Sequence, residues 1–137
     1  MGDLVRVRVL AGGAALATLG AGLGIRAIGS GDLVKYAGDA LYTVLIVALV
    51  VLVAPRVRPT VAAGVALGFS CGMELFQLTG VPAELAARST MARLVFGTTF
   101  NAPDLFWYAI GAAVGWAGHR AVCARSDERR QAFGTVS

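Results

Sequence analysis

The chain has 137 residues, of which 57% are hydrophobic and 15% are charged. Soluble domains average about 45–50% apolar and about 25% charged residues, so this composition excludes an ordinary soluble domain. The net charge of +4 comes from basic residues that punctuate apolar runs and form no stripe with interleaved aromatics, which excludes a nucleic-acid-binding protein. We therefore expect a small membrane protein that folds as one domain.

Four apolar runs are each close to the ~20 residues that a helix needs to cross the hydrocarbon core. They cover about residues 7–28, 37–54, 60–79 and 104–123. Pro55 ends the second run, and Gly80 with Pro82 ends the third. Pro103 and Asp104 mark the start of the fourth. Because a spanning helix satisfies its backbone hydrogen bonds internally, the pattern predicts an all-α bundle of four transmembrane helices.

The first run has an alternative interpretation as a signal peptide. Arg6 and Arg8 precede an apolar core, and the segment Ala15-Leu16-Ala17 resembles a cleavage site. The apolar stretch continues to Ile28, which is longer than a typical signal core. The length therefore favours a membrane span.

Two segments lie outside the four runs. The connection over residues 80–103 is too long for a simple loop, and its Ala-Glu-Leu-Ala-Ala-Arg core suits a short helix in the membrane interface. The last residues, 126–137, are polar, and we expect them to form a flexible cytoplasmic tail after a single membrane domain over 1–125.

Lysine and arginine residues predict the orientation of the chain in the membrane. The N-terminus, the second loop and the tail hold eight of the twelve basic residues. Cytoplasmic loops carry such an excess of positive charge, so both termini are predicted to be cytoplasmic.

With this orientation, one acidic residue from each of three spans lies near the outer membrane surface. These residues are Asp39, Glu74 and Asp104, and Tyr42 follows Asp39 at i+3. Glu74 is the deepest, about 8 Å below the end of its helix at 1.5 Å per residue. A charged residue inside a span costs about 2.5–3.5 kcal/mol at the helix centre and less near the interface, so an intramembrane acid suggests a functional site.

The third run combines a polar face with a face of small residues. Ser70, Glu74 and Gln77 are spaced at i, i+4 and i+7, so they share one side of a helix. Glycines on the other side are predicted to pack closely against a neighbouring helix: Gly64, Gly68 and Gly72. Neither face suits lipid, so this helix is expected to be buried.

The fourth run repeats the pattern of a polar outer end and small residues below. Asp104, Tyr108, Gly111 and Gly115 fall on one face of the expected helix. The two glycines are predicted to be packing positions. His119 follows at the cytoplasmic end, where an interfacial role is favoured over a proton relay.

Structural interpretations of the same residues stay open. Asp39 and Asp104 lie close enough to the headgroups to be solvated helix caps. An ion pair between Glu74 and Arg88 or Arg93 would have a purely structural role. The two cysteines, Cys71 and Cys123, fall at different depths, so no disulfide is expected. No Cys/His spacing indicates a metal, and we predict no cofactor.

Several short segments in a fixed order resemble a family of small bacterial membrane proteins known as domain of unknown function 2809. The segments are Tyr36–Tyr42, Glu74–Gln77, an arginine-containing loop, and Asp104–Gly111. The resemblance covers about residues 36 to 116. It implies a four-helix protein of the bacterial cytoplasmic membrane with no established activity.

A more distant similarity is to VanZ-like proteins, which are associated with resistance to the glycopeptide teicoplanin. That pattern has an acid in an early span, Glu-x-x-Gln in a later one, a basic loop residue and an Asp that opens the last helix. The chain matches it at Asp39, Glu74, Gln77 and Asp104, with Arg88 or Arg93 as the loop base. It departs from the pattern at Tyr108, where VanZ-like proteins have Asn.

We therefore expect an outward-facing polar pocket that binds a lipid headgroup or a cell-envelope precursor. Its residues would be Asp39, Glu74, Gln77, Arg88 and Asp104, with Tyr42 and Tyr108 on its walls. The alternative is a structural or accessory subunit, and a proton-coupled transporter or an intramembrane enzyme is less favoured. The expected partners are membrane lipids, a lipid-linked envelope precursor and a second copy of the chain, with no nucleic acid.

Overall fold

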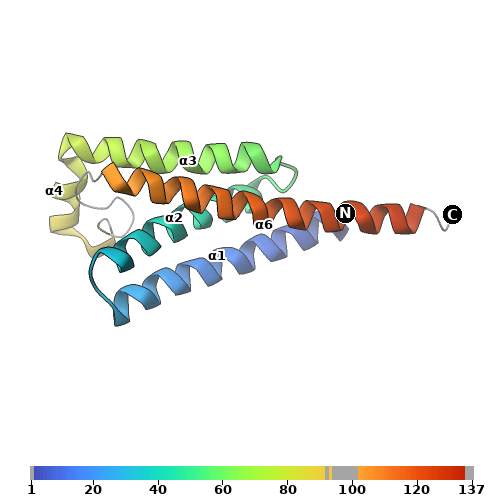
Figure 1. Ribbon diagram of the computed structural model, residues 1–137, viewed down its shortest axis with the longest axis horizontal. Coiled ribbons are helices and arrows are strands. Elements are labelled where there is room, and N and C mark those ends of the chain that lie inside the picture. Colours follow the sequence, from blue (N-terminus) through green and yellow to red (C-terminus); the bar gives the residue numbers. More distant parts are fainter. Residues whose placement is uncertain (1, 92, 94–101, 135–137) are drawn as a thin grey trace.

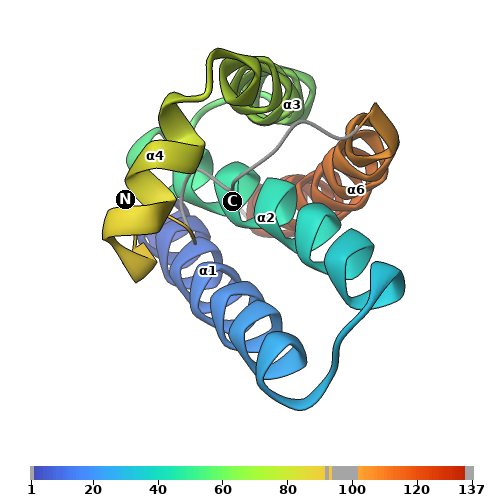
Figure 2. The same cartoon turned by 90° about the vertical axis from the view of Figure 1, so that its left-hand side faces the viewer.

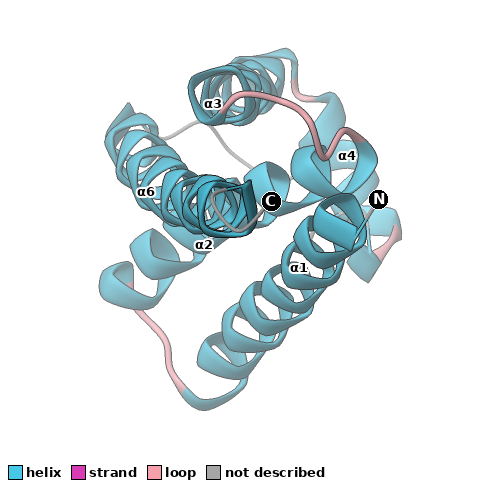
Figure 3. Ribbon diagram, turned by 90° about the vertical axis from the view of Figure 1, so that its right-hand side faces the viewer, coloured by secondary structure: helices cyan, strands magenta, loops and turns pink. Residues whose placement is uncertain are grey.

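The fold is a bundle of long helices joined by short connections. The computed structural model describes residues 2–91, 93 and 102–134, and within these ranges the regular elements are helices (Figure 3). Their bounds are α1 Gly2–Ile28, α2 Asp32–Val53, α3 Pro59–Phe76, the 3₁₀ turn η1 Gln77–Thr79, α4 Val81–Arg88 and α6 Ala102–Gly134.

Helix α2 is the central element of the bundle. Helix α1 packs against one side of it, and α3 and α6 pack against it and against each other on the other side (Figure 2). Helix α4 lies at the end of the bundle where α2 and α6 begin and α3 ends (Figure 1). The N-terminus and the α2–α3 connection lie toward the opposite end of the bundle. The last part of α6 extends beyond that end (Figure 1).

Three of the described helices are long and apolar enough to cross a membrane, by length and composition. They cover residues 4–28, 32–53 and 59–79, in agreement with the first three apolar runs. Helix α6 is not among them; the polar residues His119 and Arg120 directly follow its apolar first half. The chain therefore has the helices of a membrane protein, and the fourth span stays a prediction.

The third span ends in a tighter turn than the sequence predicts. Helix α3 stops at Phe76, and Gln77–Thr79 continues as a 3₁₀ turn. Gly80 follows with φ 81°, a left-handed conformation that glycine adopts without steric cost. The short helix expected in the next connection is confirmed as α4, whereas residues 94–101 of that connection lie outside the described residues.

The last helix is longer than predicted. We expected it to end near Cys123 and a loose tail to begin at Ser126, but α6 continues without interruption to Gly134. The expected end was wrong because the segment after Cys123 is rich in Arg, Glu, Gln and Ala, which are good helix formers, and contains no proline. The polar composition was therefore a poor guide to the end of the helix. Residues 135–137 lie outside the described part of the chain.

Two glycines of α6 allow it to lie close to α2. A Cβ atom built on Gly111 would collide with the carbonyl oxygen of Ala40, and one built on Gly115 would lie 2.9 Å from Cγ2 of Val47. Both positions therefore have too little space for a side chain. This is the packing role predicted for Gly111 and Gly115.

The glycines of α3 do not have the predicted packing role within the described protein. A Cβ atom at Gly64, Gly68 or Gly72 would meet no described atom within 4 Å. Helix α3 instead buries the stripe Ala62, Ala66, Ser70 and Glu74 against its neighbours. The prediction was wrong because small alanine and serine side chains also permit close packing, so the polar face and the packing face coincide.

These contacts predict opposite effects for two matched substitutions. Gly111→Ala should destabilise the protein by about 1–3 kcal/mol, because the new methyl group forces α2 and α6 apart. Gly68→Ala, in open space on α3, should be neutral or slightly stabilising because alanine is the better helix former. Thermal unfolding of the purified proteins in detergent measures both. Equal unfolding midpoints for the two variants would contradict the close α2–α6 contact.

Candidate functional site

The ends of three helices meet beside α4 and bring together three acidic side chains. Asp39 lies in the second turn of α2, Glu74 in the last turn of α3 and Asp104 in the first turn of α6. Glu74 is fully buried, and Asp104 is 3% exposed. An acid near a helix N-terminus interacts favourably with the helix dipole, which suits Asp104 to its position. We call these residues, with Lys35, Tyr42 and Tyr108, the acidic cluster.

Glu74 is held by a hydrogen bond from another helix. The hydroxyl of Tyr108 in α6 donates to Oε2 of Glu74 over 3.0 Å, and the residues of both groups are buried. One turn earlier in α3, Ser70 Oγ lies 3.0 Å from Oγ1 of Thr43 in α2, and both residues are fully buried. Adjacent polar residues of α3 therefore bind two different helices. A buried polar group is stable only when it is hydrogen-bonded in this way.

Asp104 is paired with a lysine that our sequence analysis did not assign to the site. The Nζ atom of Lys35 lies 3.1 Å from Oδ1 and 3.1 Å from Oδ2 of Asp104. The lysine side chain is 41% exposed, whereas that of Asp104 is 4% exposed. Lys35 stands one turn before Asp39 in α2, and this i, i+4 spacing is the signal that would have identified it.

Asp39 interacts electrostatically with both of the other acids. Its side chain lies close enough to those of Asp104, Glu74 and Lys35 to interact with their charges. The Oδ2 atom of Asp39 is buried without a hydrogen-bond partner among the described residues. The cluster therefore retains an acceptor that no described group uses.

Aromatic side chains connect α2 to α6 at the same level. The rings of Tyr42 and Tyr108 lie 6.4 Å apart between centroids with a tilt of 52°. Tyr36 and Trp107 are stacked, with centroids 5.4 Å apart and planes 14° apart. Aromatic pairs contribute about 0.5–1.5 kcal/mol beyond the area they bury, so they help to hold these two helix ends together.

The remaining predicted site residues lie at the same end of the bundle. Gln77 is half-buried in η1, less than one turn beyond Glu74. Arg88 ends α4 and is exposed, and no hydrogen bond or ion pair joins it to the acidic cluster among the residues described. Arg93 is also exposed. Lys35, and not a loop arginine, is thus the base that contacts the acids.

The composition of the cluster defines the chemistry that it supports. Three carboxyl groups gather here, and Lys35 interacts with two of them, Asp39 and Asp104. Within the described ranges, no group of three or more His, Cys, Asp or Glu residues could hold a metal ion. Cys71 and Cys123 are free thiols. The arrangement therefore suits a ligand that carries hydrogen-bond donors and positive charge.

The hydrogen bond between Tyr108 and Glu74 leads to a prediction about stability. Tyr108→Phe keeps the ring and its contact with Tyr42 but removes a donor from a fully buried carboxyl group, which should cost about 1–3 kcal/mol. Tyr36→Phe is the matched control, because the ring stacked on Trp107 is retained. Thermal unfolding in detergent should show a clearly larger loss for Tyr108→Phe. Similar midpoints for the two variants would argue against the bond.

A comparison with known protein families places this site in a wider context. The family described as "Protein of unknown function (DUF2809)" matches residues 29–112, in agreement with the resemblance noted in the sequence. The match contains every residue of the acidic cluster, whereas α1 and the second half of α6 lie outside it. No curated protein and no solved structure matches the chain, and the similarity to VanZ-like proteins stays a prediction. Because the matched segment covers more than half of the sequence, the chain belongs to the DUF2809 family of proteins of unknown function.

Proposed function

We propose that the acidic cluster binds the amine-bearing headgroup of a membrane lipid or of a lipid-linked cell-envelope precursor. The protein would be a multi-pass protein of the bacterial cytoplasmic membrane with four spans. The observation that carries the proposal is the gathering of acids at one helix end: Asp39 and Asp104 both interact with Lys35, and Glu74 acts on Asp39 as a third acid. A primary ammonium group supplies the charge and the hydrogen-bond donors that this cluster lacks.

The proposed topology rests on the position of α6 and on the distribution of positive charge. The first half of α6 packs against two helices that can each cross a membrane, which supports α6 as the fourth span. The N-terminus and the α2–α3 connection, with Arg56 and Arg58, lie toward one end of the bundle (Figure 1). Positive charge favours the cytoplasmic side for that end, so the acidic cluster would face outward.

Access to the acids would depend on Lys35. Its side chain is 41% exposed and rests on an almost fully buried carboxylate, so rotation of the lysine away from Asp104 opens a path to the acids. A ligand ammonium group then takes the place of the lysine and reaches the free acceptor of Asp39. The outward-facing pocket expected from the sequence would form in this step. Arg88 and Arg93, exposed at the same end, would meet the phosphate of the headgroup.

A role in the cell envelope follows from the same ligand chemistry. Amine and phosphate groups occur together in lipid headgroups and in lipid-linked envelope precursors, and the similarity to VanZ-like proteins points in this direction. The departure from that pattern at Tyr108 coincides with the donor to Glu74, so the site of this chain is built differently at that position. We therefore propose envelope-ligand binding without assigning resistance to a particular antibiotic.

The proposal predicts selective loss of amine binding in one variant. Asp39→Asn replaces a carboxyl group of the cluster by an amide, whose NH₂ group cannot accept a hydrogen bond from an ammonium group, but leaves the contact between Lys35 and Asp104 intact. Loss of a charge-assisted interaction of about 1.5–3 kcal/mol should weaken phosphatidylethanolamine binding by about ten- to a hundredfold. Native mass spectrometry with added lipid measures the retained molecules, and phosphatidylcholine, which has no N–H donor, is the comparison lipid.

The matched control for this experiment is Asp32→Asn. Asp32 is an exposed acid in the first turn of α2, so its replacement makes the same change from carboxyl to amide outside the cluster. This variant should bind phosphatidylethanolamine as the unmodified chain does. If both variants retain the lipid equally, or if the unmodified chain does not distinguish the two lipids, the proposal fails.

A purely structural role for the cluster is the second candidate, and the burial of Glu74 favours it. Its side chain is fully buried and hydrogen-bonded, so it could simply hold α3 to α6. This role predicts that Glu74→Ala lowers the amount of folded protein in the membrane, because a buried donor is left unpaired. The binding role predicts that Glu74→Gln, which keeps the shape, changes sensitivity to envelope antibiotics at normal abundance. Immunoblots and growth assays on the same strains separate the two roles.

A further inference from the structure

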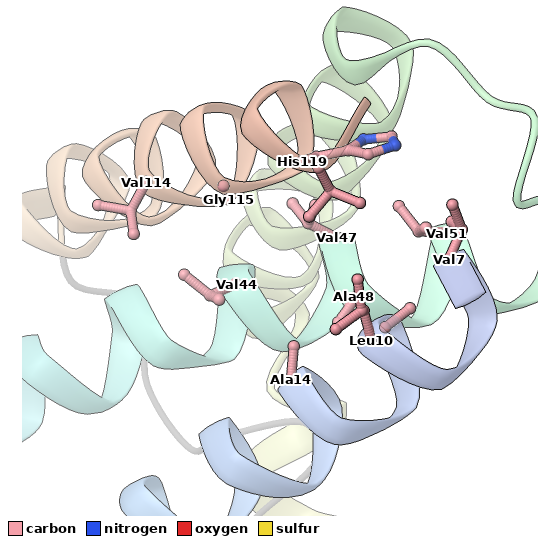
Figure 4. A pocket seen from close by; sticks show the side chains of 13 residues that line it. Val7, Leu10, Ala14, Val44, Val47, Ala48, Val51, Val114, Gly115 and His119 are labelled. Atoms are coloured by element: carbon pink, nitrogen blue, oxygen red, sulfur yellow. The ribbon is translucent and has the colours of Figure 1, made fainter. Parts of the chain in front are cut away.

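A second feature lies toward the opposite end of the bundle from the acidic cluster. An apolar groove of about 370 Å³ runs between α1 and α6 and has α2 as its floor (Figure 4). This volume is within the range of about 300–1,000 Å³ that is usual for small-molecule sites. Its walls are almost entirely aliphatic and include Leu10, Ala14, Val44, Val114 and Val122. A surface of this kind matches a hydrocarbon chain.

One polar side chain lines this apolar groove. His119 of α6 is 7% exposed, and both of its ring nitrogens are buried without a hydrogen-bond partner among the described residues. Figure 4 shows the imidazole ring toward the end of the groove at which Val7 and Val51 lie. A buried polar group without a partner is unfavourable, and native proteins rarely retain one without a use. The imidazole is therefore placed to bind the polar end of a ligand.

A second unpartnered group belongs to the same end of the groove. The Nη1 atom of Arg6 is buried and makes no hydrogen bond to a described residue. Arg6 directly precedes Val7 and stands one turn before Leu10, two residues that line the groove. Arg6 therefore starts from the α1 wall of the groove at the end where Val7 lies, and a guanidinium and an imidazole group can both donate hydrogen bonds to an anion.

We propose that this groove binds one hydrocarbon chain of an anionic phospholipid, whose phosphate group is held by Arg6 and His119. The aliphatic walls take the chain, the guanidinium group of Arg6 supplies the positive charge that selects an anionic headgroup, and the imidazole of His119 adds a hydrogen bond. Anionic lipids are abundant in the cytoplasmic leaflet, which is the side at which the basic N-terminus is expected. The site does not depend on the acidic cluster or on the function proposed for it.

The site lies partly inside the segment that matches the DUF2809 family. The floor of the groove, formed by α2, lies within residues 29–112, whereas Arg6 and His119 lie outside them.

Native mass spectrometry of the full chain in detergent tests the site with four probes. Dioleoylphosphatidylglycerol should be retained about tenfold more strongly than dioleoylphosphatidylcholine, because the tails are identical and only the charge differs. Oleate supplies a chain with a carboxylate, and glycerol 3-phosphate supplies the phosphate without a chain. Both should be retained more weakly than phosphatidylglycerol. Equal retention of the two phospholipids, or stronger retention of either fragment, would overturn the proposal.

Two pairs of variants locate the lipid. Gly118→Leu fills the groove without a steric conflict, because a Cβ atom there meets no described atom within 4 Å, and Gly68→Leu on the open face of α3 is its control. Arg6→Gln removes the guanidinium group, and its control is Arg8→Gln at an exposed position of the same helix. Both groove variants should lose about tenfold in phosphatidylglycerol retention, and both controls should keep it.

Gly118→Leu and Arg6→Gln alter different parts of the proposed site, so a folding defect in one of them does not decide the result. Size-exclusion chromatography and circular dichroism identify a variant that is misfolded, and the other variant then carries the test alone. If folded Arg6→Gln and Arg8→Gln retain phosphatidylglycerol equally, the proposed headgroup contact is wrong. If folded Gly118→Leu and Gly68→Leu retain it equally, the chain does not lie in the groove.

Discussion

The burial of a carboxyl group on α3 is the constraint on which the rest of the structure depends. Glu74 is fully buried, so polar groups from neighbouring helices must reach it, and Tyr108 does so from α6. That contact requires α6 to lie close to α2 and α3, which Gly111 permits by leaving space for the backbone of Ala40. Thr43 and Ser70 complete the connection from α2 to α3. The hydrogen bonds of the buried polar side chains and the close packing of the helices therefore depend on each other in this bundle.

The two ends of the bundle differ in chemistry, and this difference is the basis of the functional account. At one end, the acids of three helices gather, two of them interact with Lys35, and their carboxyl oxygens suit an amine. At the other end, an aliphatic groove meets two basic groups without partners, which suits a hydrocarbon chain with an anionic headgroup. The acids lie in the segment common to the family, whereas the basic groups lie outside it. The two proposed sites would then occupy opposite membrane surfaces.

Composition and hydrophobic periodicity were sufficient to predict the helical fold, the first three apolar runs and the approach of the acids of α2, α3 and α6. The i, i+4 spacing of Ser70 and Glu74 also indicated a shared polar face. The sequence could not show that this face packs inward while Gly64, Gly68 and Gly72 stay open, because both faces are compatible with a neighbouring helix. Lys35 was not assigned to the site because a basic residue at the start of a membrane helix can also serve only to orient the helix in the membrane. The end of α6 was missed because polar helices and polar tails have similar composition.

Cysteine cross-linking in native membranes tests most directly which face of α3 points inward. In a chain with Cys71→Ala and Cys123→Ala, the pair Thr43→Cys and Ser70→Cys replaces two hydroxyls that lie 3.0 Å apart. The comparison pair is Thr43→Cys with Gly68→Cys, which lies on the open face two residues away. The account predicts that oxidation forms a disulfide in the first pair and not in the second. A disulfide between residues 43 and 68, with none between 43 and 70, would contradict the buried polar face and the acidic cluster built on it.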